Sequence, residues 1–79
     1  MLMQDMLLAF IREQVSTHII GQGLSEMEEL EIDTTISYIF NENHDLEYIL
    51  YLILDFFEEN EKLKNLMPSV ENYYINLHK

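Results

Sequence analysis

The segment that decides the fold spans residues 45–57 and reads DLEYILYLILDFF. Every residue from position 48 to position 54 is apolar or aromatic, so a helix formed here is apolar on all sides. Such a helix is normally buried within a bundle or against another chain. A buried β-strand over residues 48–54 is the alternative. We favour a helix from Asp45, its expected N-cap, to about Leu66, because no Gly or Pro flanks the apolar run.

Two further helices are predicted before this segment. Over residues 2–20, apolar side chains recur at steps of three and four, and Gly21 is placed to end that helix in a left-handed conformation. Ser25 and Glu28 form a capping-box pattern that starts a second helix, which runs to about residue 40. The expected apolar side of this second helix consists of Met27, Leu30, Ile36, Ile39 and Phe40. A second cap at Asp33, which would split the helix near residue 32, is left open.

The C-terminal part predicts one more helix. Pro68 is expected to stop the helix that starts at Asp45, and Ser69 is a candidate cap for a last helix over residues 70–77. Short connections between amphipathic helices are typical of bundles. The sequence therefore predicts an all-α fold, a small bundle of about four helices with the helix over residues 45–66 at its centre. Residues 1–79 are expected to form a single acidic domain.

Negatively charged residues far outnumber positively charged ones in this chain. It has 4 Lys and Arg against 15 Asp and Glu, for a net charge of −11. Thirteen of the fifteen acids lie between Arg12 and Lys62, a stretch that contains no Lys or Arg. Helix surfaces normally mix both signs, because neighbouring like charges repel. These acids are expected to spread a negative field over the folded surface.

Several kinds of chemistry have no support in the sequence. No Cys is present, and no acid stands three residues before any of the three His, so the Glu-x-x-His spacing of carboxylate metal centres is missing. Nucleophile elbows and phosphate-binding loops are also missing. We therefore expect no enzyme, no metal and no cofactor. His18, on the apolar side of its helix, is expected to be buried or half-buried.

The same composition predicts the cellular compartment of the protein and whether it binds a membrane or nucleic acid directly. The start of the chain has no basic signal-peptide region, and no apolar run approaches the roughly 20 residues of a membrane span. A cytoplasmic protein that binds no membrane is expected, and the lack of Cys agrees with a reducing compartment. Direct binding of nucleic acid is not expected either, because phosphate neutralisation needs many Lys and Arg.

The acids predict a partner instead. Acids one helical turn apart, about 5.4 Å along the axis, could approximate the charge spacing of nucleic acid, whose duplex carries one charge per about 1.7 Å. The expected partner is a basic protein with a nucleic-acid-binding groove. Two tyrosines join the acids, because Tyr is enriched at interfaces. The predicted partner-binding residues are Glu26, Glu29, Asp33, Glu42, Glu47, Tyr48, Tyr51, Asp55, Glu58, Glu59 and Glu61. A solvated acidic surface with no partner is the alternative.

In size, charge and lack of Cys the chain resembles the small acidic inhibitors encoded by phages and mobile elements, including anti-CRISPR and other anti-defence proteins. This resemblance of composition implies a stoichiometric inhibitor or nucleic-acid mimic. The competing hypothesis is a structural or assembly protein, or an immunity or antitoxin protein, that forms a homodimer or docks through its Tyr-rich helix. A hidden helix over residues 45–66 favours the mimic. An exposed face of Tyr48, Ile49, Leu52 and Phe56 favours assembly.

Overall fold

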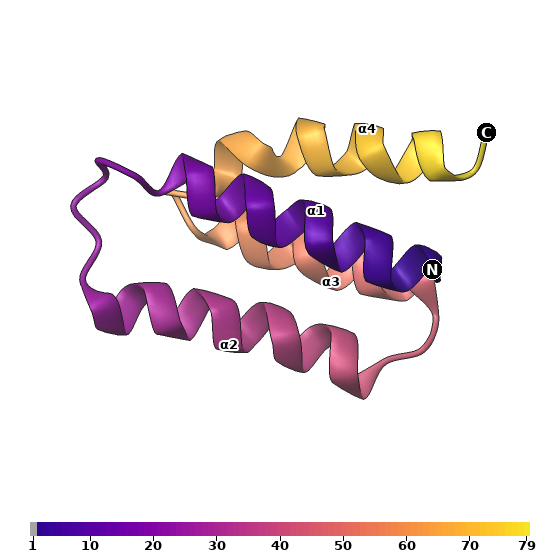
Figure 1. The fold of residues 1–79 in the computed structure, drawn as a ribbon, viewed down its shortest axis with the longest axis horizontal. Coiled ribbons are helices and arrows are strands. Elements are labelled where there is room, and N and C mark those ends of the chain that lie inside the picture. Colours follow the sequence, from indigo (N-terminus) through magenta and orange to yellow (C-terminus); the bar gives the residue numbers. More distant parts are fainter. Residues whose placement is uncertain (1) are drawn as a thin grey trace.

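The computed structural model describes residues 2–79, which form a bundle of four α-helices (Figure 1). The helices are α1 (Met3–His18), α2 (Glu26–Glu42), α3 (Leu46–Glu59) and α4 (Met67–Leu77), with a short 3-10 helix η1 (Lys64–Leu66) before α4. They run alternately up and down, and α3 packs against both α2 and α4 while α1 closes the other side. The prediction of a small all-α bundle is confirmed, and the segment expected to be a helix or a buried strand is a helix.

The core takes apolar side chains from every helix. Its buried residues are Leu7, Ile11, Val15, Ile32, Ile36, Ile39, Phe40, Ile49, Ile53, Phe57, Leu63, Leu66 and Val70. Within residues 2–79, no polar or charged side chain is buried. The side-chain contacts of the core are therefore apolar, and their burial contributes about 25 cal/mol for each Å² removed from water.

The helix predicted over residues 2–20 corresponds to α1. Its buried side is the row Leu7, Ile11 and Val15, at the expected spacing of four residues. Gly21 has a φ of +81° and Gly23 a φ of +72°, conformations that only glycine adopts easily. Gly21 lies two residues beyond the C-cap Ile19, so the left-handed turn comes slightly later than expected.

The capping box at the start of α2 is confirmed. The Ser25 hydroxyl accepts from the Glu28 amide at 3.2 Å, and the Glu28 carboxylate accepts from the Ser25 amide at 3.4 Å. The helix continues without a break past Asp33, so the alternative of a split near residue 32 is wrong. Asp33 does not cap a new helix because its carboxylate faces Arg12 of α1 instead.

Replacing Ser25 by Ala is expected to destabilise the fold by about 1 kcal/mol, because the Glu28 amide at the start of α2 loses its acceptor. Ser69 provides a matched control, because it lies in the first turn of α4 without capping it. Ser69→Ala should change the free energy of unfolding by less than about 0.5 kcal/mol. Urea denaturation followed by circular dichroism measures both. Equal losses from the two variants would contradict the capping box.

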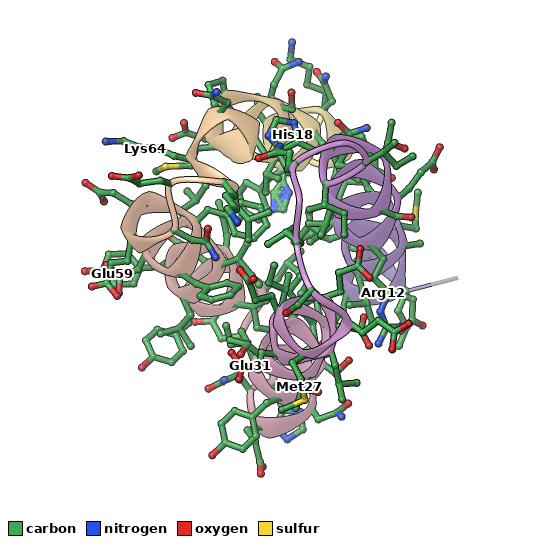
Figure 2. All side chains as sticks on the ribbon, turned by 90° about the vertical axis from the view of Figure 1, so that its left-hand side faces the viewer. Arg12, His18, Met27, Glu31, Glu59 and Lys64 are labelled. Carbon is green, nitrogen blue, oxygen red and sulfur yellow. The ribbon has the colours of Figure 1, made fainter. Side chains whose placement is uncertain are left out.

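The predicted apolar side of α2 is partly wrong. Ile36, Ile39 and Phe40 are buried as expected, but Met27 is 68% exposed and Leu30 is 62% exposed. Each residue turns a helix by about 100°. Ile32, four residues before Ile36, therefore lies on the same buried side of α2. Met27 and Leu30 lie on the outward side. Figure 2 shows Met27 on the side of α2 that points away from the bundle.

The helix that begins after Asp45 ends sooner than predicted. The Asp45 carboxylate accepts from the Glu47 amide at 3.2 Å and so caps α3 as expected. The helix stops at Glu59 and not near Leu66. Asn60 has an extended conformation, and its side chain accepts from the Lys62 amide at 3.0 Å, which replaces the next helical turn. Acids in the last turn also oppose the negative end of the helix dipole.

Pro68 begins a helix and does not end one. It lies in the first turn of α4, where its missing N–H is not needed. Consequently α4 starts at Met67 and not at Val70, and Ser69 does not cap it. Val70 is fully buried, and Tyr73, Tyr74 and Leu77 pack against the core, as the predicted apolar stripe required.

Candidate protein-binding surface

All fifteen Asp and Glu side chains lie at the surface. Arg12 Nε lies 3.4 Å from Asp33 Oδ1, and Lys62 Nζ lies 3.5 Å from Glu28 Oε2. These pairs are partly exposed, so each contributes little stability. In the described part of the chain the other two cations, Lys64 and Lys79, form no ion pair. Among residues 2–79, Asp33 and Glu28 are therefore the only acids that have a Lys or Arg partner.

The outward side of α3 carries the largest share of the predicted partner-binding residues. Tyr48, Tyr51, Asp55 and Glu58 are separated by three or four residues, so they share one side of the helix. We call these four residues the α3 strip. Tyr48 is 50% exposed, Tyr51 is 67% exposed, and both acids are exposed. The predicted residues Glu47 and Glu59 are exposed at the two ends of the same helix.

The apolar residues of α3 are mostly hidden. Ile49, Ile53 and Phe57 have no exposed surface, and Leu52 and Phe56 are half-buried against the core. Of the four residues whose exposure would favour assembly, only Tyr48 is exposed. The side of α3 that faces solvent is therefore a mixture of tyrosine and carboxylate.

The end of α3 meets the start of α2 at an open hollow of about 430 Å³. Glu59 and Glu61, both predicted partner-binding residues, line it together with Glu28 and Lys62. The pKa of Glu28 is lowered, first by the hydrogen bond from the Ser25 amide and then by the charge of Lys62. Glu28 is not among the predicted partner-binding residues, because its place in the capping box was the stronger signal in the sequence.

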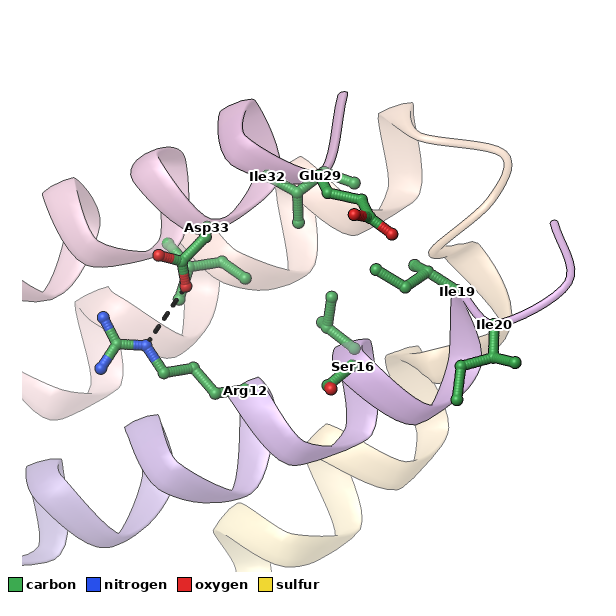
Figure 3. A pocket seen from close by; sticks show the side chains of 9 residues that line it. Arg12, Ser16, Ile19, Ile20, Glu29, Ile32 and Asp33 are labelled. Carbon is green, nitrogen blue, oxygen red and sulfur yellow. Dashed lines mark ion pairs between the residues drawn. The ribbon is translucent and has the colours of Figure 1, made fainter. Parts of the chain in front are cut away.

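The predicted acids of α2 do not join this surface. Glu26, Glu29 and Asp33 follow one another at steps of three and four and lie on the side of α2 that faces α1. Figure 3 shows Glu29 and the Arg12–Asp33 pair at the rim of an apolar groove between the two helices, of about 250 Å³. The Ser37 hydroxyl also accepts from Arg12. These three acids therefore lie on a different side of the bundle from the α3 strip.

Glu42 and Glu47 lie at the opposite end of the bundle from Glu58, Glu59 and Glu61. Glu42 ends α2, and Glu47 is in the first turn of α3. Burial, and then the charges of Glu47 and Asp45 at the start of α3, raise the pKa of Tyr74 on α4 above its ordinary value. The acids therefore extend along the whole length of α3.

The tyrosines separate into two groups. The Tyr73 ring stacks on Phe10 with centroids 4.0 Å apart, and the Tyr74 ring lies 4.5 Å from the ring of His78. Both of these tyrosines are half-buried at the edge of the core. Tyr48 and Tyr51 are exposed, as is Tyr38 of α2 at 63%. Only the exposed group is available for contacts with another molecule.

Other kinds of site receive little support from residues 2–79. No three His, Asp or Glu residues of this part are placed to hold a metal ion. Across the same residues, no helix has both the length and the apolar character that crossing a bilayer requires. His18 is half-buried at the end of α1, as its position on the apolar side predicted.

The unpaired acids predict that salt stabilises the fold. Raising NaCl from about 0.01 M to about 1 M shortens the Debye length from about 30 Å to about 3 Å. Repulsion among exposed carboxylates then weakens, and Tm should rise by about 4–8 °C for each kcal/mol gained. Calorimetry at several NaCl concentrations measures this. A Tm that falls or stays constant would show that the acids do not strain the fold.

The chain matches no protein-family model, and neither a curated protein nor a solved structure is detectably similar to it.

Proposed function

We propose that this protein is a non-enzymatic binding module that occupies the basic, nucleic-acid-binding surface of another protein and blocks it in a one-to-one complex. The α3 strip carries this proposal. It presents tyrosine and carboxylate side chains together on a helix whose larger apolar residues are hidden. A surface of this kind suits a basic partner, because Tyr rings bury area and can face Lys or Arg, while carboxylates form charge-assisted hydrogen bonds.

The distribution of charge supports blocking of a groove. Acids run from Glu47 at the start of α3 to Glu58, Glu59 and Glu61 at its end, with none of the chain's bases on α3. A groove that binds phosphates is lined by Lys and Arg and attracts such a row from a distance. Association should therefore be fast and sensitive to salt. A blocking protein of this kind has the role of the anti-defence inhibitors that the chain resembles in composition.

A competition measurement tests the proposal. The purified protein is used to capture proteins from host lysate, and bound proteins are eluted with a salt gradient. The expected result is a basic nucleic-acid-binding protein released by moderate salt, with a one-to-one mass by light scattering. The captured partner should no longer bind its DNA or RNA once it is in the complex. A partner that binds its nucleic acid equally well in the complex would contradict the proposal.

Assembly is the second candidate, because Tyr48 and Tyr51 remain exposed. In this case the protein would form a homodimer, or dock into a larger complex, through the same side of α3. Light scattering of the protein alone separates the two candidates. A stable homo-oligomer that captures no basic partner would favour assembly and leave the acids with a solubilising role.

A further inference from the structure

The helix α2 has apolar side chains on two sides. One side provides Ile32, Ile36, Ile39 and Phe40 to the core. The outward side carries a second row, which we call the α2 stripe: Met27, Leu30, Thr34 and Tyr38. Met27, Leu30 and Tyr38 are 68%, 62% and 63% exposed. A helix that only covers a core needs one apolar side, so the second row is unexplained by the fold.

The spacing of the α2 stripe suits a second helix. Its residues follow at steps of three, four and four, which keeps the row nearly parallel to the helix axis for three turns, about 16 Å. An open hollow of about 340 Å³ lies along it, lined by Met27, Leu30 and Thr34 with Glu31 and Thr35. Apolar side chains of a facing helix insert into such hollows between the residues of a stripe.

No described element of the chain covers the stripe. The neighbours of α2 are α1 and α3, and both contact it on the side that faces the core. Figure 2 shows α2 at the edge of the bundle, with Met27 directed into solvent. Exposed apolar rows that are rimmed by polar residues mark sites of protein interaction.

The residues beside the stripe select the partner. Glu26 flanks one edge together with Asp33, which is paired with Arg12, and Glu31 and Glu42 flank the other edge; all four acids are exposed. Among residues 26–42 there is no Lys or Arg. Flanking charges decide which helices pair, because they face the flanking positions of the partner helix. Acid on both edges favours a partner helix with Lys or Arg on both edges, and it disfavours a second copy of this chain.

We propose that the α2 stripe binds a basic amphipathic helix of a partner protein, with an apolar row in the hollow and Lys or Arg against the flanking acids. This inference rests on the proposed function for the basic character of the partner, and it adds a second contact on a different helix. Where the α3 strip supplies charge and tyrosine, the α2 stripe supplies apolar area.

A peptide titration tests the inference. The probe is a synthetic helix of about 18 residues, five helical turns, with Leu on one row and Lys at the flanking positions. It is added to the isotope-labelled protein, and amide shifts are followed by NMR. We expect shifts centred on residues 27–38. The triple variant Met27→Ser, Leu30→Ser, Tyr38→Ser should weaken binding at least about tenfold, because a few apolar anchors carry most of a contact.

Two controls make the titration specific. The variant Tyr48→Ser, Tyr51→Ser removes exposed side chains from α3 and should leave the peptide affinity within about twofold, because the two surfaces share no residue. A peptide with Glu in place of Lys, and one with its Leu residues scattered around the helix, should both bind at least about tenfold more weakly.

Other results would overturn the inference. Shifts centred on the α3 strip, or equal binding of the Glu peptide, would remove the α2 stripe as a basic-helix site. If the protein formed a dimer in high salt and the triple serine variant did not, the α2 stripe would bind a second copy of this chain. None of these results affects the competition between the α3 strip and nucleic acid, so the proposed function can survive failure of this inference. If the protein did not compete with nucleic acid, the proposed function would fail, but the peptide titration would still show whether the α2 stripe binds a basic helix.

Discussion

Replacing Glu58, Glu59 and Glu61 by Lys is expected to weaken binding to the basic target at least about 100-fold, or about 2.7 kcal/mol. Each substitution converts an attraction to Lys or Arg into a repulsion. At a separation of about 4 Å one such contact amounts to about 1 kcal/mol in water and more where the interface excludes water. Less than about tenfold of the loss should appear in the association rate, which electrostatic steering controls, and the rest in a faster dissociation, because direct contacts become repulsive.

The same variant is expected to be more stable than the natural chain. Glu58 and Glu59 occupy the last turn of α3, where the helix dipole is negative and no base is present. A cation at such a position is favoured by about 0.3–1 kcal/mol. Affinity should therefore fall while Tm rises, and unfolding cannot account for the loss of binding. Surface plasmon resonance and calorimetry measure the two effects on one sample.

A variant with equal charge serves as the control. Reversing three acids changes the net charge from −11 to −11 + 6 = −5. Asp5, Glu13 and Glu71 are exposed on α1 and α4, and their replacement by Lys gives the same net charge. This control should lose less than about tenfold in affinity, because only long-range steering changes. Equal losses in the two variants would show that total charge decides binding and that the end of α3 has no special role.

Replacing Phe57 by Ala is expected to destabilise the fold by about 3–5 kcal/mol. The Phe57 side chain has no exposed surface, and its ring centre lies 5.9 Å from that of Phe56. A chain of 79 residues has a total stability of about 4–12 kcal/mol at the usual 0.05–0.15 kcal/mol per residue. The variant should therefore be largely unfolded or unfold at a much lower urea concentration.

Tyr51 offers the matched control for this measurement. It belongs to the same helix and is also aromatic, but 67% of its surface is exposed. Tyr51→Ala should change the free energy of unfolding by less than about 0.5 kcal/mol, while it weakens target binding through the α3 strip. If Phe57→Ala were as mild as Tyr51→Ala, the placement of α3 in the bundle would be wrong.

The sequence predicts this fold best where a signal is local. Ser25 with Glu28, Asp45 with Glu47, and Gly21 act within three or four residues, so their effect can be recognised without knowing the rest of the chain. Pro68 is ambiguous for a physical reason, because proline disrupts a helix interior but is well tolerated in a first turn. The end of α3 at Asn60 was not predicted, because the polar residues 58–62 fit the solvated side of a longer helix equally well.

The candidate surface was harder to predict than the fold. Exposure of acids follows from their charge, but the side of the bundle on which each acid lies depends on how α2 is rotated about its axis. That rotation is decided by contacts of Ile32 and Ile36 with residues far away in sequence. Met27 and Leu30 are as apolar as their buried neighbours, and only the packed bundle distinguishes the two rows. The predicted acids of α2 and α3 were therefore assigned to one surface, although Glu26, Glu29 and Asp33 face α1 and the acids of the α3 strip do not.

The confinement of all charged side chains to the surface of the bundle has a consequence for how such a chain can change. Among residues 2–79 the buried positions contain no carboxylate, amide or hydroxyl that an external substitution would leave without a partner. Exposed residues other than the caps Ser25 and Asp45 and the turn glycines can then be exchanged, one at a time, at little risk to the fold. If the proposed partner changed its basic surface, substitutions on the exposed sides of α2 and α3 would be enough to restore binding. The binding surfaces of this bundle can therefore change many times while its apolar core stays the same.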